Sequence, residues 1–371
     1  MKYYLIAGEA SGDIHGSKLM EDIKIYDNQA IFRYWGGDKM KSQGGKLVRH
    51  FKNHSFMGFW EVFKNLITII NNLRFCKEDI RLFNPDIIIY IDYPGFNLKI
   101  AKWAKKNNFK NIFYISPQIW AWKENRIKSI KRDIDKMFVI LPFEKKYYKK
   151  IHNYEVTYTG NPLVEIINNV KKIKSSDFLL KHNINEEKKI IALLPGSRKQ
   201  EISVMLPTFI KVSKEFIKYK FIIAGAPGIS KNYYKKIIKN HDIKIIFDKT
   251  YDILKISVAA IVTSGTATLE TALFNVPQIV CYKSSTLTYF IAKKIIKLKY
   301  ISLVNLIMNK KIVSEIIQKD FKTDIIMTEL RSILNGEIRE RQLLNYSILK
   351  KKLTDFEKNE TIGQKIVNFL K

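Results

Sequence analysis

The chain has few cysteines and no long hydrophobic run. Among its 371 residues, Cys76 and Cys281 are the only cysteines. Their separation suits neither a disulfide framework nor a zinc site, so we expect a reducing compartment. No apolar run approaches the roughly 18 residues of a membrane-spanning helix, and the N-terminal residues lack the layout of a secretory signal. The sequence therefore predicts a protein that is cytoplasmic or that lies on a membrane without crossing it.

Acidic residues are also scarce. The chain has 65 Lys and Arg residues against 35 Asp and Glu residues, which gives a formal net charge of +30. A surface rich in solvated lysines would explain this excess, because Lys, Ile and Asn are all frequent. An anionic partner would explain it equally well, and nucleic acid, a membrane surface and a phosphorylated substrate all qualify. The charge alone leaves both interpretations open.

Short apolar runs alternate with longer helical patterns along most of the chain. The runs with the length and composition of strands in the first half are Tyr3–Ala7, Ile31–Trp35, Ile87–Ile91, Ile112–Ile115, Met137–Ile140 and Val156–Thr159. Those in the second half are Ile190–Leu194, Phe221–Ala224, Ile243–Phe247, Ala259–Val262 and Gln278–Cys281. After the last of them the pattern predicts helices to the end. Such alternation favours parallel sheets that are covered on both faces.

The polar stretch 171–189 has no strong periodicity and separates the two halves. We therefore predict an α/β protein with two doubly wound Rossmann-like domains facing a cleft. The first domain is expected at residues 1–165 and the second at 166–337. The last helices, at about 338–371, are expected to cross back to the first domain.

Two glycine-containing turns in the second half each link a predicted strand to a predicted helix. They are Leu193–Glu201 and Thr263–Glu270. A turn of this kind directs free backbone N–H groups and the positive end of the helix dipole at an anion. As a pair they predict that the second domain binds a diphosphate. In the first half, Gly8–Gly16 has neither a GxGxxG nor a P-loop spacing, so dinucleotide or ATP binding is poorly supported there.

The first half has three polar segments that directly follow predicted strands. Gly8–Gly16 is either a ligand-facing turn or a tight turn capped by Ser11 or Asp13. Asp92 is either a carboxylate that accepts a proton at the carboxyl end of a strand or a cap for the next helix. The tryptophans of Ser116–Lys123 either line an apolar or sugar-stacking wall or belong to the core. The residues alone leave each pair of readings open.

Seven motifs occur in an order that resembles the lipid-A-disaccharide synthase family. They are Gly8–Asp13, Ser116–Trp122, Leu141–Glu144, Leu194–Arg198, Ser264–Glu270, Tyr300–Leu303 and Glu315–Gln318. The resemblance implies an inverting glycosyltransferase with two Rossmann-like domains, the GT-B fold. Such an enzyme joins UDP-2,3-diacylglucosamine to 2,3-diacylglucosamine 1-phosphate and releases UDP. It would belong to lipopolysaccharide biosynthesis.

The resemblance also implies roles for particular residues. Asp92 would be the base, since Gly95 stands where many members have Asp, and Arg198 would stabilise the departing diphosphate. The other residues expected near the UDP donor are Ser197, Glu201, Gly265, Thr266, Glu270, Asn305 and Gln318. Glu201 has the alternative role of orienting Arg198 from three residues away. The residues expected near the substrate in the first domain are Glu9, Ser11, Gly12, Asp13, Gln118 and Trp120.

No metal and no cofactor are expected. Asp133-Ile134-Asp135 has the D-x-D spacing that holds a metal on UDP in other glycosyltransferases. In those enzymes an apolar strand precedes the acidic pair. Here Arg132 precedes the pair and the apolar run follows it, so we do not expect a metal site there.

The segment 56–70 is rich in aromatic and aliphatic residues at helical spacing and has basic residues around it. It is either an ordinary buried helix or a helix that inserts shallowly into an anionic membrane. Acylated substrates favour the membrane reading, in which Phe56, Phe59, Trp60 and Phe63 would contact lipid. We then expect a peripheral protein on the cytoplasmic face of the inner membrane of a Gram-negative-type bacterium. Its partners would be the two acyl sugars and the anionic membrane surface.

Two other functions deserve comparison. A UDP-N-acetylglucosamine 2-epimerase would share the architecture, but it would need neither an acceptor nor the apolar helix. A basic protein that binds nucleic acid would show aromatic and Arg residues interleaved on a recognised fold. The lysines of this chain are spread diffusely instead, so we expect no nucleic-acid partner.

Overall fold

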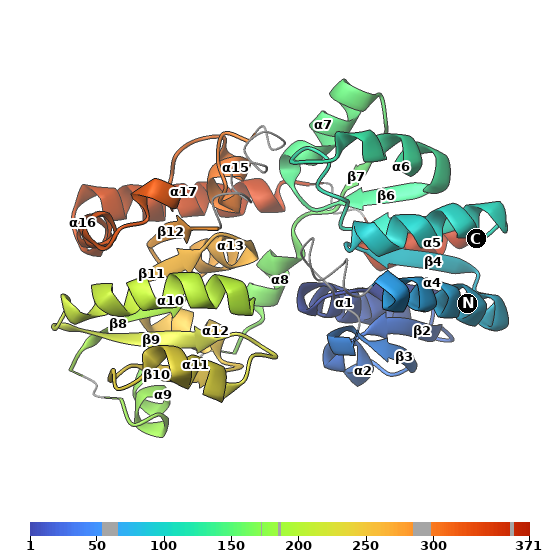
Figure 1. Ribbon diagram of the computed structural model, residues 1–371. Helices are drawn as coiled ribbons and strands as arrows, with labels where there is room; N and C mark the ends of the chain where they lie inside the picture. The colour runs from blue at the N-terminus through green and yellow to red at the C-terminus, as the bar shows by residue number, and fades with distance from the viewer. Residues whose placement is uncertain (54–65, 172, 185–186, 285–297, 357–359) are drawn as a thin grey trace. The chain divides into compact units, whose positions relative to one another are not determined.

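Figure 1 shows the computed structural model, in which residues 1–53, 66–171, 173–184, 187–284, 298–356 and 360–371 are described. Contacts within the chain divide it into two compact units. Unit 1 comprises Met1–Pro162 and Asp355–Lys371, and unit 2 comprises Leu163–Thr354. Each is described by itself below.

Unit 1 is built on a seven-stranded parallel sheet with the order β3-β2-β1-β4-β5-β6-β7. Its strands are β1 Lys2–Ala7, β2 Ile31–Gly36, β3 Lys46–His50, β4 Ile87–Ile91, β5 Asn111–Tyr114, β6 Lys136–Val139 and β7 Thr157–Tyr158. Because successive side chains of a strand point to opposite faces, Tyr4 and Ile6 pack on one face of the sheet while Tyr3 and Leu5 pack on the other. Both faces are therefore apolar and need a cover.

Helices cover both faces of this sheet. The helices of unit 1 are α1 Ala10–Tyr26, α2 Asp38–Ser42, α4 Leu66–Phe83, α5 Pro94–Lys106, α6 Ile127–Asp133, α7 Pro142–His152 and α18 Ile362–Leu370, with 3₁₀ turns η1 at Phe51–Asn53 and η2 at Glu124–Arg126. Helices α4, α5, α6 and α7 pack on the face of Tyr4. Helices α1, α2 and α18 pack on the face of Tyr3. Helix α18, which follows unit 2 in the chain, thus completes the core of unit 1.

Unit 2 has a six-stranded parallel sheet with the order β10-β9-β8-β11-β12-β13. Its strands are β8 Lys189–Leu194, β9 Tyr219–Gly225, β10 Lys244–Phe247, β11 Ser257–Thr263, β12 Gln278–Tyr282 and β13 Ser314–Ile317. Its helices are α9 Ser175–Lys181, α10 Lys199–Lys214, α11 Lys231–Ile238, α12 Thr250–Ile256, α13 Thr266–Leu273, α15 Leu303–Met308, α16 Thr323–Leu334 and α17 Glu337–Thr354, with η3 at Gln318–Asp320. Helix α8, Pro162–Asn168, lies at the junction of the units.

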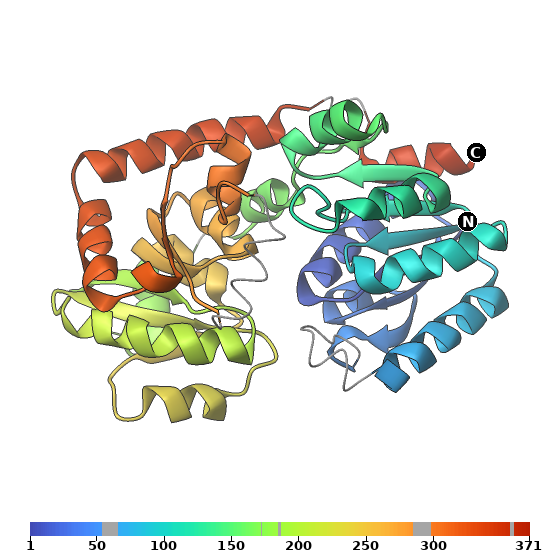
Figure 2. The same cartoon turned by 45° about the horizontal axis from the view of Figure 1, so that its top comes forward.

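The sheet of unit 2 is also covered on both faces. Helices α10, α11 and α16 pack on one face, and α9, α12 and α13 pack on the other. Figure 2, a view turned by 45°, shows α10 and α11 along the sheet and α16 leading into the long helix α17. Among the helices that the structure describes, none is both long and apolar enough to span a bilayer.

The predicted fold class is confirmed, with one kind of omission. Each predicted strand overlaps a strand of the structure, and both sheets are parallel and doubly wound. The sequence did not predict β3 or β13, and the expectation of helices alone after Cys281 was wrong at β13. Both strands lie at sheet edges, where side chains are partly exposed and no continuous apolar run is needed.

The packing of α18 on α1 makes Gly363 a sensitive position. A Cβ atom there would lie 2.6 Å from the backbone carbon of Asp22 and 2.7 Å from the backbone nitrogen of Ile23. We expect Gly363→Ala to lower the free energy of unfolding by about 1–3 kcal/mol, because α18 must move away from α1. Thermal or denaturant unfolding measures this. Gly95→Ala is the matched control, since nothing lies within 4 Å of its added methyl, and an equal loss in both variants would contradict the prediction.

Candidate active site

The sheet of unit 1 reverses its strand order between β1 and β4, which are hydrogen-bonded neighbours. Ligands of doubly wound folds bind at the carboxyl ends of the strands at this point. Ala7 and Ile91 end these strands and are paired with each other. Glu9 and Asp92, which follow them, therefore lie at the same edge of the sheet. The two turns are in close contact, since a Cβ atom on Gly8 would lie 2.3 Å from the ring of Tyr93. The structure therefore brings the predicted residues Glu9 and Asp92 together.

The backbone around Asp92 has an uncommon conformation. Asp92 and Tyr93 have φ values of +46° and +52°, a left-handed region that non-glycine residues seldom adopt. Asn97, which is buried, donates from Nδ2 to the backbone oxygen of Asp92 at 2.7 Å and to that of Ile6 at 3.3 Å. Strained backbone of this kind is concentrated at functional sites, where the surrounding structure has to maintain it. Asn97 provides part of that support.

The environment of Asp92 raises its pKa to about 7. Desolvation by the surrounding protein is the main cause, and the negative charge of Glu9 adds to it. The backbone amide of Tyr93 and the positive charge of Arg126 oppose the shift, and Glu144 reinforces it. A carboxylate whose pKa lies near neutral pH is matched to general base catalysis.

Glu144 belongs to this region, although the sequence assigned it no role. It is buried at the start of α7. Its Oε1 accepts hydrogen bonds from Ser116 Oγ at 2.7 Å and Trp120 Nε1 at 3.0 Å, and its Oε2 accepts from the amide of Leu141 at 2.9 Å. Trp120, a predicted site residue, is thereby fixed, and Gln118 beside it is exposed. Desolvation raises the pKa of Glu144 as well.

Two other residues of the first motif, Gly12 and Asp13, have contacts within unit 1. Asp13 is buried, and its carboxylate accepts hydrogen bonds from the backbone amides of Gly37 at 2.7 Å, Lys39 at 3.0 Å and Met40 at 3.0 Å. It therefore holds the N-terminus of α2. Gly12 lets α1 approach β1, since a Cβ atom there would lie 3.1 Å from that of Ala7. Ser11 is partly buried next to it.

The sheet of unit 2 also has a point at which its strand order reverses and predicted site residues follow two adjacent strands. Its strand order reverses between β8 and β11, which are hydrogen-bonded neighbours with Leu194 paired to Val262. The two predicted phosphate-facing turns therefore leave adjacent strands at the same edge of the sheet. In the second turn Gly265 has φ +156° and ψ −164°, a region that essentially only glycine adopts. It and Thr266 are exposed at the start of α13.

The first turn of unit 2 is organised by Glu201. Its Oε2 accepts hydrogen bonds from the amides of Ser197 at 2.9 Å and Arg198 at 3.3 Å. Its Oε1 lies 3.6 Å from Nη1 of Arg198, whose side chain is 54% exposed. Glu201 therefore matches its alternative role of orienting Arg198. Gly196, with φ +115°, lets this carboxylate approach, since an added Cβ atom would lie 2.6 Å from it.

Two further residues predicted near the donor, Glu270 and Gln318, have their side chains engaged within unit 2. Glu270 Oε1 accepts from the hydroxyl of Tyr251 at 2.8 Å, and burial raises the pKa of Glu270. Gln318 bonds the backbone nitrogen of Ser284 at 2.7 Å and its backbone oxygen at 3.3 Å. Glu270 lies in α13, which follows β11, and Gln318 follows the edge strand β13.

Asn305 is a third residue expected near the donor whose side chain is engaged within unit 2. It is fully buried, and its Oδ1 accepts from the amides of Ile312 at 2.7 Å and Val313 at 3.0 Å. Its Nδ2 donates to the backbone oxygen of Val313 and to Glu315 Oε1, both at 2.9 Å. All four hydrogen-bonding positions of the amide are thus used within the protein. Asn305 therefore shapes the loop before β13.

The predicted membrane residues Phe56, Phe59, Trp60 and Phe63 lie outside the described residues. The described part of that region begins with α4. There Ile67 and Ile70 are 76% and 42% exposed. They lie on one helical face because they are three residues apart.

The carboxylates of the D-x-D sequence are engaged with basic groups. Asp133 is buried and accepts two hydrogen bonds of 2.7 Å from Arg132. Asp135 accepts from Lys105 and, at 2.7 Å, from the amide of Asn111. Asn111 opens β5, so Asp135 lies at the amino end of the strands, away from Asp92.

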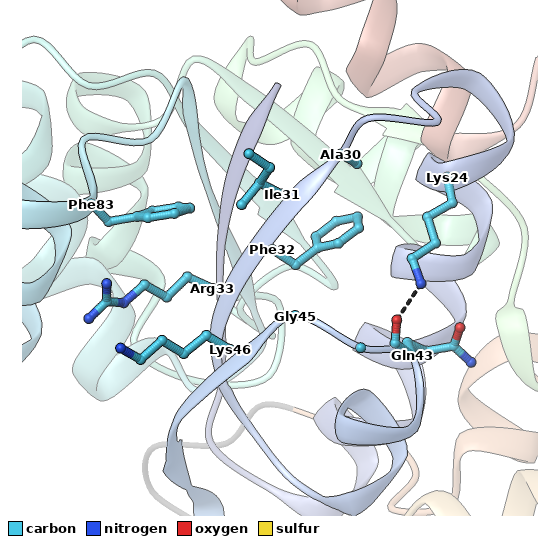
Figure 3. Close-up of a pocket in the computed structure, with 10 residues that line it drawn as sticks. Lys24, Ala30, Ile31, Phe32, Arg33, Gln43, Gly45, Lys46 and Phe83 are labelled. Carbon is cyan, nitrogen blue, oxygen red and sulfur yellow. Dashed lines mark hydrogen bonds between the residues drawn. The ribbon is translucent and has the colours of Figure 1, made fainter.

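A cavity of about 500 Å³ lies elsewhere in unit 1 (Figure 3). Its lining residues include Ile31, Phe32 and Arg33 from the start of β2. The strands are parallel, so this is the sheet edge opposite to the one with Asp92. Two of its cations are already engaged, because Arg33 donates to Asp79 and Lys24 donates to the backbone oxygen of Gln43. Because it lies at the opposite edge of the sheet, the cavity is separate from the candidate site.

Comparisons with known proteins give matches over nearly the whole chain. A family model described as lipid-A-disaccharide synthetase matches residues 3–366. The chain is 35% identical over 347 residues to a lipid-A-disaccharide synthase of Syntrophus aciditrophicus, covering 91% of this chain and 90% of the relative. It is 34% identical over 336 residues to one of Coxiella burnetii, covering 90% and 88%.

A solved structure of similar fold is the UDP-GlcNAc 2-epimerase from Neisseria meningitidis bound to UDP-GlcNAc. The TM-score is 0.62 at 12% identity, covering 100% of this chain and 99% of the epimerase. At such low identity the likeness establishes the fold alone, which is the GT-B arrangement of two parallel α/β sheets. The sequence relationship decides between the two enzyme classes. The chain belongs to the lipid-A-disaccharide synthase family, the glycosyltransferases of lipid A biosynthesis.

Proposed function

We propose that this chain joins UDP-2,3-diacylglucosamine to 2,3-diacylglucosamine 1-phosphate with Asp92 as the general base. The observation that carries the proposal is the position and pKa of Asp92. It lies at the reversal point of the sheet in unit 1, and its pKa of about 7 leaves a large fraction ionised at neutral pH. A base must be ionised to accept a proton. Proton transfer is most effective when the pKa of the base lies near the ambient pH.

The reaction on the acceptor follows from this assignment. The acceptor's 6-hydroxyl oxygen forms a bond to the anomeric carbon of the donor. The bond from that carbon to the β-phosphate oxygen of UDP breaks at the same time, and the hydroxyl proton passes to Asp92. Attack from the face opposite the leaving group inverts the anomeric centre. Glu9 and Glu144 raise the pKa of Asp92 through their charges, which makes it a stronger base.

The donor is assigned to unit 2. Negative charge develops on the diphosphate as the glycosidic bond breaks, and preorganised donors stabilise such charge. Arg198 provides a guanidinium, and the backbone amides of Gly265 and Thr266 provide the N-terminus of α13. Glu201 and Ser197 hold the turn that carries Arg198. Glu270 is assigned to the ribose hydroxyls and Gln318 to the support of the loop at Ser284.

One assay tests the activity and separates it from its closest rival. UDP release from UDP-2,3-diacylglucosamine is measured with and without 2,3-diacylglucosamine 1-phosphate. We expect release that depends on the acceptor, together with a disaccharide product. Release without the acceptor, or conversion of UDP-N-acetylglucosamine to its 2-epimer, would contradict the proposal and favour an epimerase.

The substrates carry acyl chains, and we propose that the protein binds an anionic membrane surface on the cytoplasmic side. Ile67 and Ile70 form an exposed apolar face on α4, and Arg74 on the same helix is exposed as well. Apolar side chains beside basic ones are typical of helices that lie in the membrane interface. The net charge of +30 would attract the protein to anionic lipid.

Vesicle sedimentation tests this membrane role. We expect the protein to sediment with anionic vesicles at low salt, and the double variant Ile67→Asp and Ile70→Asp to reduce the bound fraction about tenfold. Leu180→Asp is the control, because Leu180 is an equally exposed apolar residue on α9 of unit 2. Failure of the wild-type protein to bind anionic vesicles at any salt concentration would refute the membrane role.

A further inference from the structure

A group of one aromatic and two basic side chains lies on the loop that follows β5 in unit 1. Trp122 is 43% exposed. The Lys123 ammonium lies 4.5 Å from the centre of the Trp122 ring, and the Arg126 guanidinium lies 5.1 Å from it. The sequence left open whether Trp122 lines a sugar-stacking wall or belongs to the core, and it assigned no role to Lys123 or Arg126. We call them the Trp122 group.

The local backbone arranges the two cations around the ring. Lys123 has φ +53°, the left-handed conformation, and it precedes the 3₁₀ turn at Glu124–Arg126. The carboxylate between them in sequence is turned elsewhere. Glu124 accepts a hydrogen bond from the hydroxyl of Tyr147 at 3.2 Å and lies 3.4 Å from His152. Glu124 therefore has its own partners on α7.

Both cations of the Trp122 group are partly desolvated. Burial lowers the pKa of Lys123, and the nearby positive charge of Arg126 lowers it further. Burial also lowers the pKa of Arg126, while the charge of Asp92 raises it. Two cations that repel one another and are partly desolvated are stabilised by a bound anion. A phosphate is well suited, because it accepts bidentate hydrogen bonds from a guanidinium and a point contact from an ammonium.

The Trp122 group is also close to the proposed base. The charges of Arg126 and Asp92 influence each other's pKa. The loop itself is fixed to the start of α7, because Trp120 and Ser116 both donate to the buried Glu144. A ligand that reaches from Asp92 to the Trp122 group would therefore need a hydroxyl at one end and an anion at the other. A hexose phosphate has this form.

We propose that Trp122, Lys123 and Arg126 bind the phosphate end of the acceptor sugar. This inference rests on the proposed function, which supplies an acceptor with a 6-hydroxyl and a 1-phosphate. Lys123 and Arg126 contact the phosphate, and the exposed indole of Trp122 packs against the sugar ring. The arrangement orients the acceptor so that its hydroxyl, rather than its phosphate, faces Asp92.

Steady-state kinetics with two acceptors test the inference. With 2,3-diacylglucosamine 1-phosphate we expect Lys123→Ala and Arg126→Ala each to reduce kcat/KM about 10- to 100-fold through the acceptor KM. The KM for the UDP donor should stay within about twofold. With 2,3-diacylglucosamine, which lacks the phosphate, the wild-type rate should be low and the variants should match it. Arg126→Lys should recover part of the loss.

Two controls separate anion binding from other effects. Lys128→Ala removes an exposed lysine of the neighbouring helix α6 and should leave the acceptor KM unchanged. The pH profile distinguishes the two cations. Arg126→Ala should move the acid limb of kcat to higher pH, because the charge of Arg126 lowers the pKa of Asp92. Lys123→Ala should leave that limb in place.

A binding measurement keeps the inference testable if the proposed reaction fails. Glucosamine 1-phosphate and glucosamine serve as soluble probes of the headgroup, and binding is followed by isothermal titration calorimetry and, for the phosphate, by ³¹P line broadening. We expect the phosphorylated sugar alone to bind, and Lys123→Ala with Arg126→Ala to abolish its binding. Equal binding by the double variant, or unchanged acceptor KM in both single variants, would overturn the inference even where the enzyme is active.

Discussion

Replacing Asp92 with Asn should reduce kcat by about 10³-fold, within the range that a general base contributes. The side chain keeps its shape but can no longer accept the hydroxyl proton. UDP binding is assigned to the other unit, so the dissociation constant for UDP should not change. Single-turnover kinetics and calorimetry with UDP measure the two quantities. A variant with more than about a tenth of the wild-type kcat would contradict the role of Asp92.

The pH dependence gives an independent check on the same residue. Since the base is active when ionised, kcat should rise with pH up to about 7 and then become level. Stability should change in the opposite direction. Burial raises the folded-state pKa of Asp92 from its ordinary value of 3.8 to about 7, so its stabilising contribution is complete below pH 4 and is lost as the pH rises through 7.

Asp92→Asn should accordingly unfold at a higher temperature than the wild-type protein at pH 8, with a gain of about 1–3 kcal/mol. The gain should disappear near pH 4. Asp38→Asn is a matched control, because Asp38 is an exposed carboxylate of the same unit. A fall in stability in Asp92→Asn at pH 8 would show that the carboxylate is well solvated, which would remove the physical basis for its raised pKa.

Replacing Arg198 with Ala should reduce kcat about 10²- to 10³-fold, the effect of removing one donor from a developing anion. The guanidinium is largely exposed and is oriented by Glu201 at 3.6 Å, so its loss should scarcely affect folding. Arg198→Lys should recover only part of the rate, because an ammonium cannot make bidentate contacts with a phosphate. The measurement is steady-state kinetics at saturating donor.

Lys199→Ala provides the control for Arg198. Lys199 is the next residue, is exposed, and stacks on the ring of Tyr233 5.8 Å away. It carries the same charge into the same region without facing the turn. If both variants lost the same activity, the effect would come from the general positive field and the assignment of Arg198 to the diphosphate would be wrong.

The sequence predicted the elements that bear the site because local patterns encode them. A buried parallel strand needs a continuous apolar run, and the turn after it needs small or polar residues. Asp92, Glu9 and the two turns of unit 2 all follow such runs. The order of strands within each sheet then places these turns together.

What a polar residue contacts could not be predicted in the same way. Asp13 and Asn305 were both expected near a ligand. Asp13 accepts from backbone amides 24 and 27 residues away, and Asn305 accepts from amides of the loop that follows its own helix. Glu144 lies in the motif Leu141–Glu144, but the sequence assigned it no role. Its hydrogen bonds to Ser116 and Trp120 depend on the tertiary fold, so they could not be predicted. Lys123 and Arg126 could not be recognised from the sequence as a pair of interacting cations, because the chain has 65 Lys and Arg residues.

The position of α18 has a consequence for how the chain is made. Unit 1 contains residues on both sides of unit 2, and Ile366 and Val367 of α18 are buried in its core. Unit 2 is a single continuous segment, so it can fold on the ribosome as soon as it has emerged. Unit 1 cannot close the Tyr3 face of its sheet until α18 is synthesised. The part of this face that α18 covers therefore stays exposed to chaperones and proteases while nearly two hundred residues of unit 2 are translated.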